Sequence, residues 1–234
     1  MPHRVRVAAF PAQAWRSKNR GNAMKLYTEN YPAPNPRKVH IYLAEKGIKD
    51  VEMVHTPMAK RAHKAPDFMA KNSLGQVPVL ETNDGRFLSE SVAICRFFEA
   101  LHPTPPLFGR SPFEMAEVEM WIRRSEFRLW TPMGQVWIND DPRTAVVNPN
   151  QNKEYGAHMR RVTANAMKWI DKELSGAGPF LVHDYFSMAD IVLLCGLDFA
   201  KFVNMPIADD LTHLKAWHAR VSARPSARAE GVPK

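Results

Sequence analysis

A proline-rich segment, HPTPPLFGRSP at residues 102–112, divides the sequence into two parts with different patterns. Prolines at this density interrupt helices and strands alike, so we expect a linker here. Upstream, short alternating stretches are mixed with helical ones, whereas every long downstream segment has helical periodicity. The sequence therefore predicts a small α/β domain at residues 24–101 and an all-helical domain at residues 113–234.

The upstream part follows the order strand, helix, strand, helix, strand, strand, helix. After a short strand at residues 25–28, the turn YPAPNP leads into a helix that we expect to begin at Pro36, with Asn35 as its N-cap, and to end at Gly47. The Asn-Asp-Gly at residues 83–85 is a strong hairpin signal. The first crossover demands parallel pairing and the last hairpin antiparallel pairing, which predicts a mixed four-stranded sheet.

Composition and charge exclude several classes of protein. The hydrophobic content of 45% is enough for a packed core, and the longest apolar run, residues 191–195, is far below the ~18 residues of a membrane-spanning helix. Five of the eight excess positive charges lie in residues 1–23, which contain no acidic residue. We expect this stretch to be a disordered extension, or to precede a start at Met24, and we expect neither nucleic acid nor membrane as a partner.

Both cysteines, Cys95 and Cys195, lie inside apolar helical patterns. Neither has a second cysteine or a histidine at a metal-binding or redox spacing, so we expect no disulfide and no metal site. Free cysteine packs as a small hydrophobic residue. Two buried thiols fit a reducing, cytoplasmic location.

Three segments together resemble the cytosolic glutathione transferases of the bacterial or theta/zeta-like kind. They are MKLYTENYPAPNPRKVHIYLAEKGI from residue 24, NSLGQVPVLETNDGRFLSESVAICRFFEA from residue 72, and PFLVHDYFSMADI from residue 179. The resemblance implies an α+β thioredoxin-like N-terminal domain (βαβαββα) that binds glutathione, an all-α helical second domain, and a homodimer.

The resemblance also implies which residues contact glutathione. Val77, before a cis Pro78, is expected to pair with the cysteinyl backbone, and Glu90 and Ser91 are expected to hold the γ-glutamyl end. Free N–H groups at a helix start suit a carboxylate there. His63, within a basic cluster, is expected near the glycine carboxylate. The implied glutathione-binding set is His63, Gln76, Val77, Pro78, Glu90 and Ser91.

The turn before the first helix departs from the family. Alignment places Ala33 where the theta- and zeta-like enzymes carry the catalytic serine, and a methyl group cannot donate a hydrogen bond to sulfur. Three sources of thiolate stabilisation stay open: the Asn35 amide, the Tyr31 hydroxyl and the positive end of the helix. We therefore expect catalysis by Asn35 or Tyr31, with low activity.

The downstream part contains two further groups of residues with expected roles, one in substrate binding and one in helix capping. The long helical segment at residues 113–138, with a kink expected at Pro132, borders the second-substrate pocket in the family. We expect that pocket to be lined by apolar side chains of Phe127, Trp130, Met133 and Trp137. Ser187 and Asp190 form a capping-box pattern, whose expected role is stability and not chemistry.

The sequence thus predicts an enzyme that binds glutathione as co-substrate, stabilises its thiolate and transfers it to a small hydrophobic electrophile, without a metal. Two alternatives stay open. One is a non-catalytic module that binds glutathione or another ligand, or serves as a dimeric interaction platform. The other is a glutathione-dependent isomerase, dehalogenase or peroxidase on the same fold.

Overall fold

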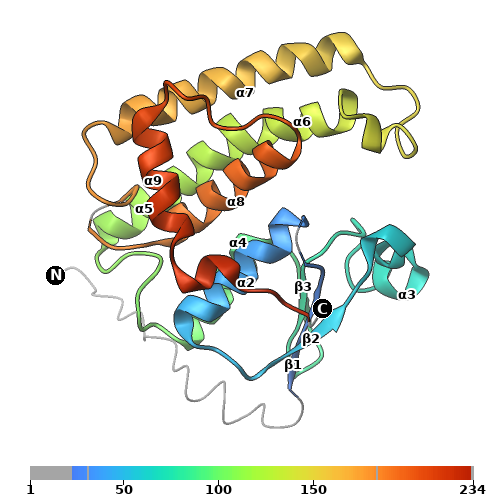
Figure 1. Cartoon of the computed structure of the whole chain (residues 1–234). Coiled ribbons are helices and arrows are strands. Elements are labelled where there is room, and N and C mark those ends of the chain that lie inside the picture. The colour runs from blue at the N-terminus through green and yellow to red at the C-terminus, as the bar shows by residue number, and fades with distance from the viewer. Residues whose placement is uncertain (1–22, 31, 183, 233–234) are drawn as a thin grey trace, which may run out of the picture.

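The computed structural model describes residues 23–30, 32–182 and 184–232. Tyr31 and residues 1–22, for which expectations are stated above, lie outside the described part. The upstream part has the predicted βαβαββα order (Figure 1). Its elements are β1 (Met24–Thr28), α2 (Pro34–Lys46), β2 (Val51–His55), α3 (Pro66–Met69), β3 (Val79–Glu81), β4 (Phe87–Leu88) and α4 (Ser91–Leu101).

The four strands form the predicted mixed sheet, in the order β2-β1-β3-β4. β1 pairs with β2 in parallel and with β3 antiparallel, and β3 pairs antiparallel with β4. The hairpin turn is closed by the Thr82 N–H, which donates to the Arg86 carbonyl at 2.9 Å. α2 and α4 lie on one side of the sheet and α3 on the other (Figure 1).

α2 begins two residues earlier than the sequence analysis predicts. Ala33 occupies the N-cap position, so Asn35 lies within the first turn and the prediction that it caps the helix is wrong. The physical reason is that Pro34 and Pro36 both fit a first turn, where their missing N–H groups would have no intrahelical partner anyway. The predicted end is confirmed, because Gly47 has the left-handed conformation with φ of 64°.

Every regular element after residue 111 in the described part is helical, as predicted. The long ones are α5 (Pro112–Ser125), α6 (Thr131–Asn139), α7 (Lys153–Leu174), α8 (Met188–Phe202) and α9 (Thr212–Ser222). Residues 102–111 form neither helix nor strand, yet Leu107 and Phe108 within them are buried. None of the helices in the described ranges combines the length and the apolar character needed to span a membrane.

α5 and α6 are joined by a π-helical turn, η3 (Glu126–Trp130). Pro132 follows this turn, and it has no N–H to donate to the carbonyl four residues earlier. The Thr131 hydroxyl donates instead to the Glu126 carbonyl at 3.0 Å, and the Thr131 N–H bonds the same carbonyl. The irregularity predicted at Pro132 is therefore a widened turn just before it.

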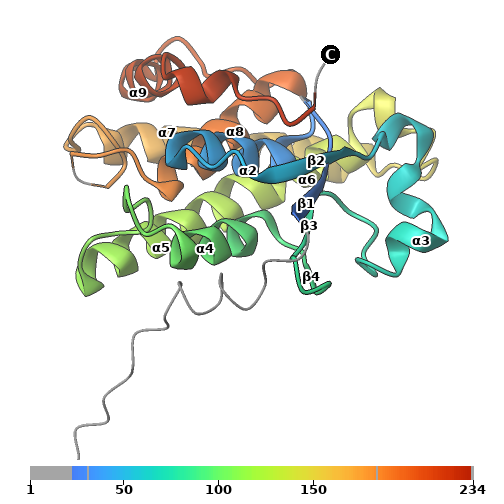
Figure 2. The same ribbon diagram turned by 90° about the horizontal axis from the view of Figure 1, so that it is seen from below.

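A single hydrophobic core joins the two parts, because buried residues of β1, α2 and α4 are continuous with those of α5, α8 and α9. Arg37 on α2 adds an ion pair to Asp198 on α8 at 2.6 Å. The C-terminal tail then returns to the sheet, beside β1 and β2 (Figures 1 and 2). There, the Asn30 carboxamide donates to the Val232 carbonyl at 2.8 Å and accepts the Gly231 N–H at 2.9 Å.

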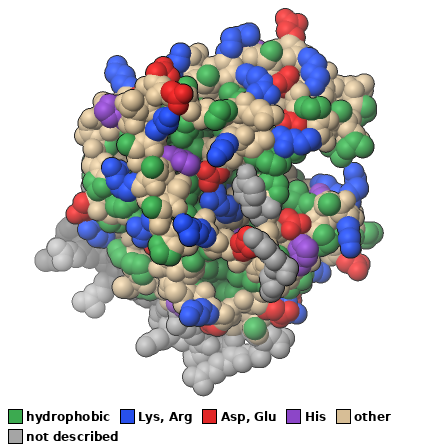
Figure 3. All heavy atoms as spheres, viewed as in Figure 1, with side chains coloured by type: hydrophobic (Ala, Val, Ile, Leu, Met, Phe, Trp, Pro, Cys, Tyr) green, Lys and Arg blue, Asp and Glu red, His purple; other side chains and the backbone are tan. Residues whose placement is uncertain are grey.

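Charged side chains are dispersed over the face seen in Figure 3, with Lys and Arg interspersed among Asp and Glu. On this face the basic side chains do not gather into the single patch that nucleic-acid binding uses. Cys95 and Cys195 are both free thiols in the core, as expected.

Candidate functional site

A groove runs between α2, the start of β3 and α4. Its lining residues are Asn35, Asn72, Gln76, Val77, Pro78, Glu90 and Ser91. The Val77–Pro78 peptide bond is cis, in agreement with the expectation. Five of the six residues predicted to bind glutathione therefore line one groove, although they come from two different segments of the chain.

The turn before Val77 is fixed by its own hydrogen bonds. The Asn72 side chain donates to the Gln76 carbonyl at 2.9 Å and accepts the Leu74 N–H at 3.2 Å. Gly75 has φ of 56°, and a Cβ there would lie 2.6 Å from the Met69 sulfur. Only glycine fits both the conformation and the space. The turn thus holds Gln76 and Val77 in place.

Glu90 and Ser91 lie where the chain enters α4. Glu90 is the N-cap residue with φ of 67°, a region that non-glycine residues seldom occupy. Ser91 is the first helical residue and is buried, whereas Glu90 is exposed. The first N–H groups of a helix have no intrahelical acceptor, so this end of α4 presents donors and a hydroxyl to the groove.

The N-terminus of α2 faces the same groove with few donors. Pro34 and Pro36 have no N–H, so Asn35 supplies the only backbone donor of the first three helical positions. The Asn35 side chain is exposed, and within the described residues it has no hydrogen-bond partner. Asn35 therefore offers both its backbone N–H and its amide to a ligand. Tyr31, the other predicted catalytic residue, is outside the described part.

A larger cavity of about 430 Å³ continues from the groove. It shares Asn35, Glu90 and Ser91 with the groove, and its other lining residues are Lys38, Val92, Ala93, Arg96, Arg123 and Glu126. Lys38 is not among the residues predicted from the sequence to form the site. A signal was present, because Lys38 follows Asn35 by three residues and so lies on the same face of the helix.

His63 lies in a short 3₁₀ turn, Ala62–Lys64, outside the set of groove-lining residues. Burial lowers the pKa of its imidazole, and the charges of Lys64 and Arg61 lower it further. This turn packs against Gly75, where an added Cβ would come within 2.8 Å of the His63 carbonyl. A contact between His63 and the glycine carboxylate stays a prediction.

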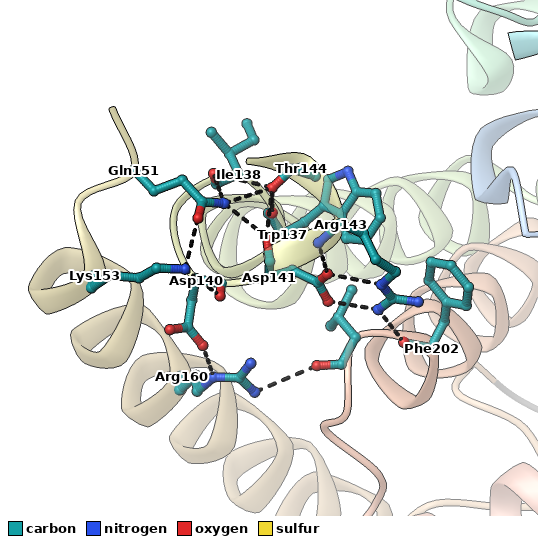
Figure 4. Close-up of polar contacts among 11 residues, drawn as sticks. Trp137, Ile138, Asp140, Asp141, Arg143, Thr144, Gln151, Lys153, Arg160 and Phe202 are labelled. Atoms are coloured by element: carbon teal, nitrogen blue, oxygen red, sulfur yellow. Dashed lines mark hydrogen bonds and ion pairs between the residues drawn. The ribbon is translucent and has the colours of Figure 1, made fainter. Parts of the chain in front are cut away.

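The prediction for the second-substrate pocket is wrong for Met133, whose side chain is fully buried in the core. Trp137 packs edge-on against Phe199 and is covered by the Arg143 guanidinium, which also contacts Phe202 and Asp141 (Figure 4). Trp130 is half-buried, and its indole N–H donates to the Val192 carbonyl at 3.1 Å.

Phe127 is 66% exposed, so it remains available to a ligand or a partner.

The physical reason for the error on Met133 is the π-helical turn. One additional residue per turn rotates everything downstream by roughly 100° relative to a regular helix. An apolar stripe drawn along residues 127–137 as one helix therefore does not lie on one face.

Ser187 and Asp190 form the predicted capping box at the start of α8. The Asp190 carboxylate is fully buried and accepts the N–H groups of Ser187 and Leu181 and the indole N–H of Trp217. Burial raises the pKa of Asp190 to about 6. Its partners are structural groups, which fits a role in stability. In the described ranges no three His, Cys, Asp or Glu side chains are grouped to hold a metal ion.

Comparison with known proteins agrees with this architecture. The model of the glutathione S-transferase N-terminal domain matches residues 33–101, and that of the C-terminal domain matches residues 138–225. Glutathione S-transferase 2 of Saccharomyces cerevisiae is 37% identical over 215 residues, which cover 90% of this chain and 92% of the yeast protein.

Solved structures show the same likeness. The crystal structure of Gtt2 from Saccharomyces cerevisiae has a TM-score of 0.81 at 37% identity and covers 87% of this chain and 98% of that one. A glutathione S-transferase domain-containing protein from Marinobacter aquaeolei has a TM-score of 0.80 at 36% identity, covering 86% and 98%. Together with the groove built around cis Pro78 and Ser91, these matches show that the chain belongs to the glutathione S-transferase family.

Proposed function

We propose that this protein is a glutathione transferase that binds glutathione in the groove between α2 and α4 and transfers its sulfur to a small apolar electrophile. The cysteinyl backbone pairs with Val77 beside cis Pro78, and the γ-glutamyl end lies at the start of α4. The observation that carries the proposal is that Asn35, Val77 and Ser91 line one groove, at the N-termini of two helices.

The chemistry of the site follows from its donors. A free thiol has a pKa near 8.5, so at neutral pH most of it is protonated. The N–H and amide of Asn35 and the positive end of α2 favour the thiolate over the thiol. The thiolate sulfur then forms a bond to the electrophilic carbon, and the leaving group departs with its electron pair. Ala33 contributes no donor, so we expect modest turnover.

We also propose a cytoplasmic location, the domain boundaries at residues 24–101 and 113–234, and a homodimer. Free, buried thiols support the location. Large apolar side chains exposed on β4, α5 and η3 support a protein interface, because exposed apolar surface often marks a site of protein association. They are Phe87, Phe113, Met115, Met120 and Phe127.

Calorimetric titration with reduced glutathione tests the proposal, together with turnover assays for conjugation, peroxidase and isomerase substrates. Ser91→Ala should weaken binding by roughly 1 to 3 kcal/mol, the cost of removing a hydrogen bond to a charged group. Ser89→Ala, just before α4, is the matched control and should bind normally. Binding without any turnover would favour a non-catalytic binding module, and absent binding would refute the assignment.

A further inference from the structure

Lys38 is a buried lysine for which the described residues supply no counter-ion. The residue is 3% exposed, and its ammonium lies 3.8 Å from the ring centroid of Trp130. Within the described residues it forms no hydrogen bond and no ion pair. Burial lowers the pKa of this amine, and the weaker interactions with Cys195 and Glu126 raise it only in part. Lysine at such depth is rare unless it is paired with an anion.

The position of the ammonium is set by its contact with the ring of Trp130. Lys38 projects from α2, and Trp130 of η3 supplies the aromatic face beneath it, held by its own bond to Val192. A cation over an indole ring is attracted by the ring's electron density, which fixes the side chain without neutralising its charge. The amine therefore remains available to pair, as an ammonium, with an anion that enters from solvent.

The cavity lined by Lys38 contains a second anion-binding element. Ser91, Val92 and Ala93, the first three residues of α4, line the same 430 Å³ space. Their N–H groups have no acceptor within the helix, and the helix dipole makes this end positive. The carboxylates of Glu90 and Glu126 also line the cavity, but neither forms an ion pair with Lys38. The buried Lys38 and the N-terminus of α4 thus line one cavity, which is partly open to solvent.

We propose that Lys38 is a further binding residue of the glutathione site, and that its ammonium pairs with the α-carboxylate of the γ-glutamyl group at the N-terminus of α4. This inference rests on the proposed function. It places Lys38 at the γ-glutamyl end of the tripeptide, in contact with neither the glycine carboxylate nor the sulfur. A carboxylate here replaces the missing counter-ion, and the desolvation cost of the buried charge is offset only in the complex.

Lys38→Met removes the charge and keeps the length of the side chain, and Lys38→Gln gives a second uncharged variant. Three probes locate the affected group by calorimetric titration: reduced glutathione, γ-glutamylcysteine, and 4-aminobutyryl-cysteinyl-glycine, which lacks only the α-carboxylate. Both variants should lose about tenfold to a hundredfold in affinity for the first two probes, the range of a hydrogen bond to a charged group. They should bind the third probe as the wild type does.

Lys46→Met is the matched control, because Lys46 is the other buried lysine side chain of α2 and is paired with Glu99 at 2.5 Å, away from the cavity. It should lower the melting temperature but leave the affinity for glutathione unchanged. Equal losses for all three probes in Lys38→Met, or a loss that spares only γ-glutamylcysteine, would overturn the inference. If the wild type fails to bind glutathione, the proposed function falls as well.

Discussion

The indole N–H of Trp217, on α9, donates a 3.0 Å hydrogen bond to the buried carboxylate of Asp190, on α8. The same carboxylate accepts the N–H groups of Leu181 and Ser187, so one side chain joins two helices and the loop between α7 and α8. Asp190→Ala should therefore lower the free energy of unfolding by about 3 kcal/mol or more, since it strands several buried donors. Denaturant titration measures this.

Trp217→Phe provides the graded comparison for Asp190. It removes one donor and keeps most of the buried ring, so we expect a smaller loss of about 1 kcal/mol. The turnover per folded molecule should stay nearly unchanged in both variants. Normal stability with impaired turnover in Asp190→Ala would contradict the structural role of this residue.

Asn35 should determine the ionisation of the bound thiol. Asn35→Ala keeps the backbone N–H and removes only the amide, so we expect at least a tenfold fall in kcat, equivalent to about 1.4 kcal/mol in the barrier. The apparent thiol pKa from the pH profile of turnover should rise. If Tyr31→Phe raises it and Asn35→Ala does not, the donor is Tyr31. If neither changes the profile while turnover persists, the helix terminus acts alone.

His40 makes stability depend on pH. Its imidazole bonds the Thr28 hydroxyl at 2.6 Å in the core, and burial, aided by the charge of Arg37, lowers its pKa to about 4. Between pH 6.5 and 4 the unfolded chain binds more protons at this residue, so acidification reduces stability. The full effect approaches about 3 kcal/mol.

The non-titrating variant His40→Gln should flatten this dependence when unfolding free energies are measured from pH 7 to pH 4. Asp190, whose pKa is raised to about 6, acts in the opposite direction. Its folded form binds more protons between pH 4 and 6, so this contribution falls as pH rises. The contribution of Asp190 is the same in both proteins, so it cancels when the stability curve of His40→Gln is subtracted from that of the wild type. Parallel curves would show that His40 does not titrate differently on folding.

The absence of a side chain at Gly196 on α8 leaves room for the Trp130 ring. A Cβ at this position would lie 2.7 Å from the indole nitrogen of Trp130. Gly196→Ala should therefore displace the ring that supports Lys38, cost about 1 to 3 kcal/mol of stability and weaken glutathione binding. Gly134→Ala on α6 is the control, because an added methyl meets open space there and should be neutral or slightly stabilising. Equal effects of the two substitutions would contradict this account.

The order of strands and helices was predictable because it depends on local signals, such as the hairpin turn at residues 83–85 and Gly47 at the end of α2. The groove was predictable through a family resemblance. The start of α2 was not, because two prolines are equally acceptable in a first turn. The burial of Met133 in the core was not predictable, because the π-helical turn that orients it depends on packing between helices. Lys38 was missed because lysine is ordinarily a surface residue.

The returning C-terminal tail bears on the order in which the chain acquires its structure. Arg224 pairs with Glu45 at the end of α2, and residues 231–232 bond Asn30 beside the turn that leads into α2. A ribosome makes those residues after every other element described here. The N-terminal glutathione-binding part therefore lacks these contacts until synthesis has passed α9. During that interval the surface that the tail later covers is accessible to chaperones and proteases.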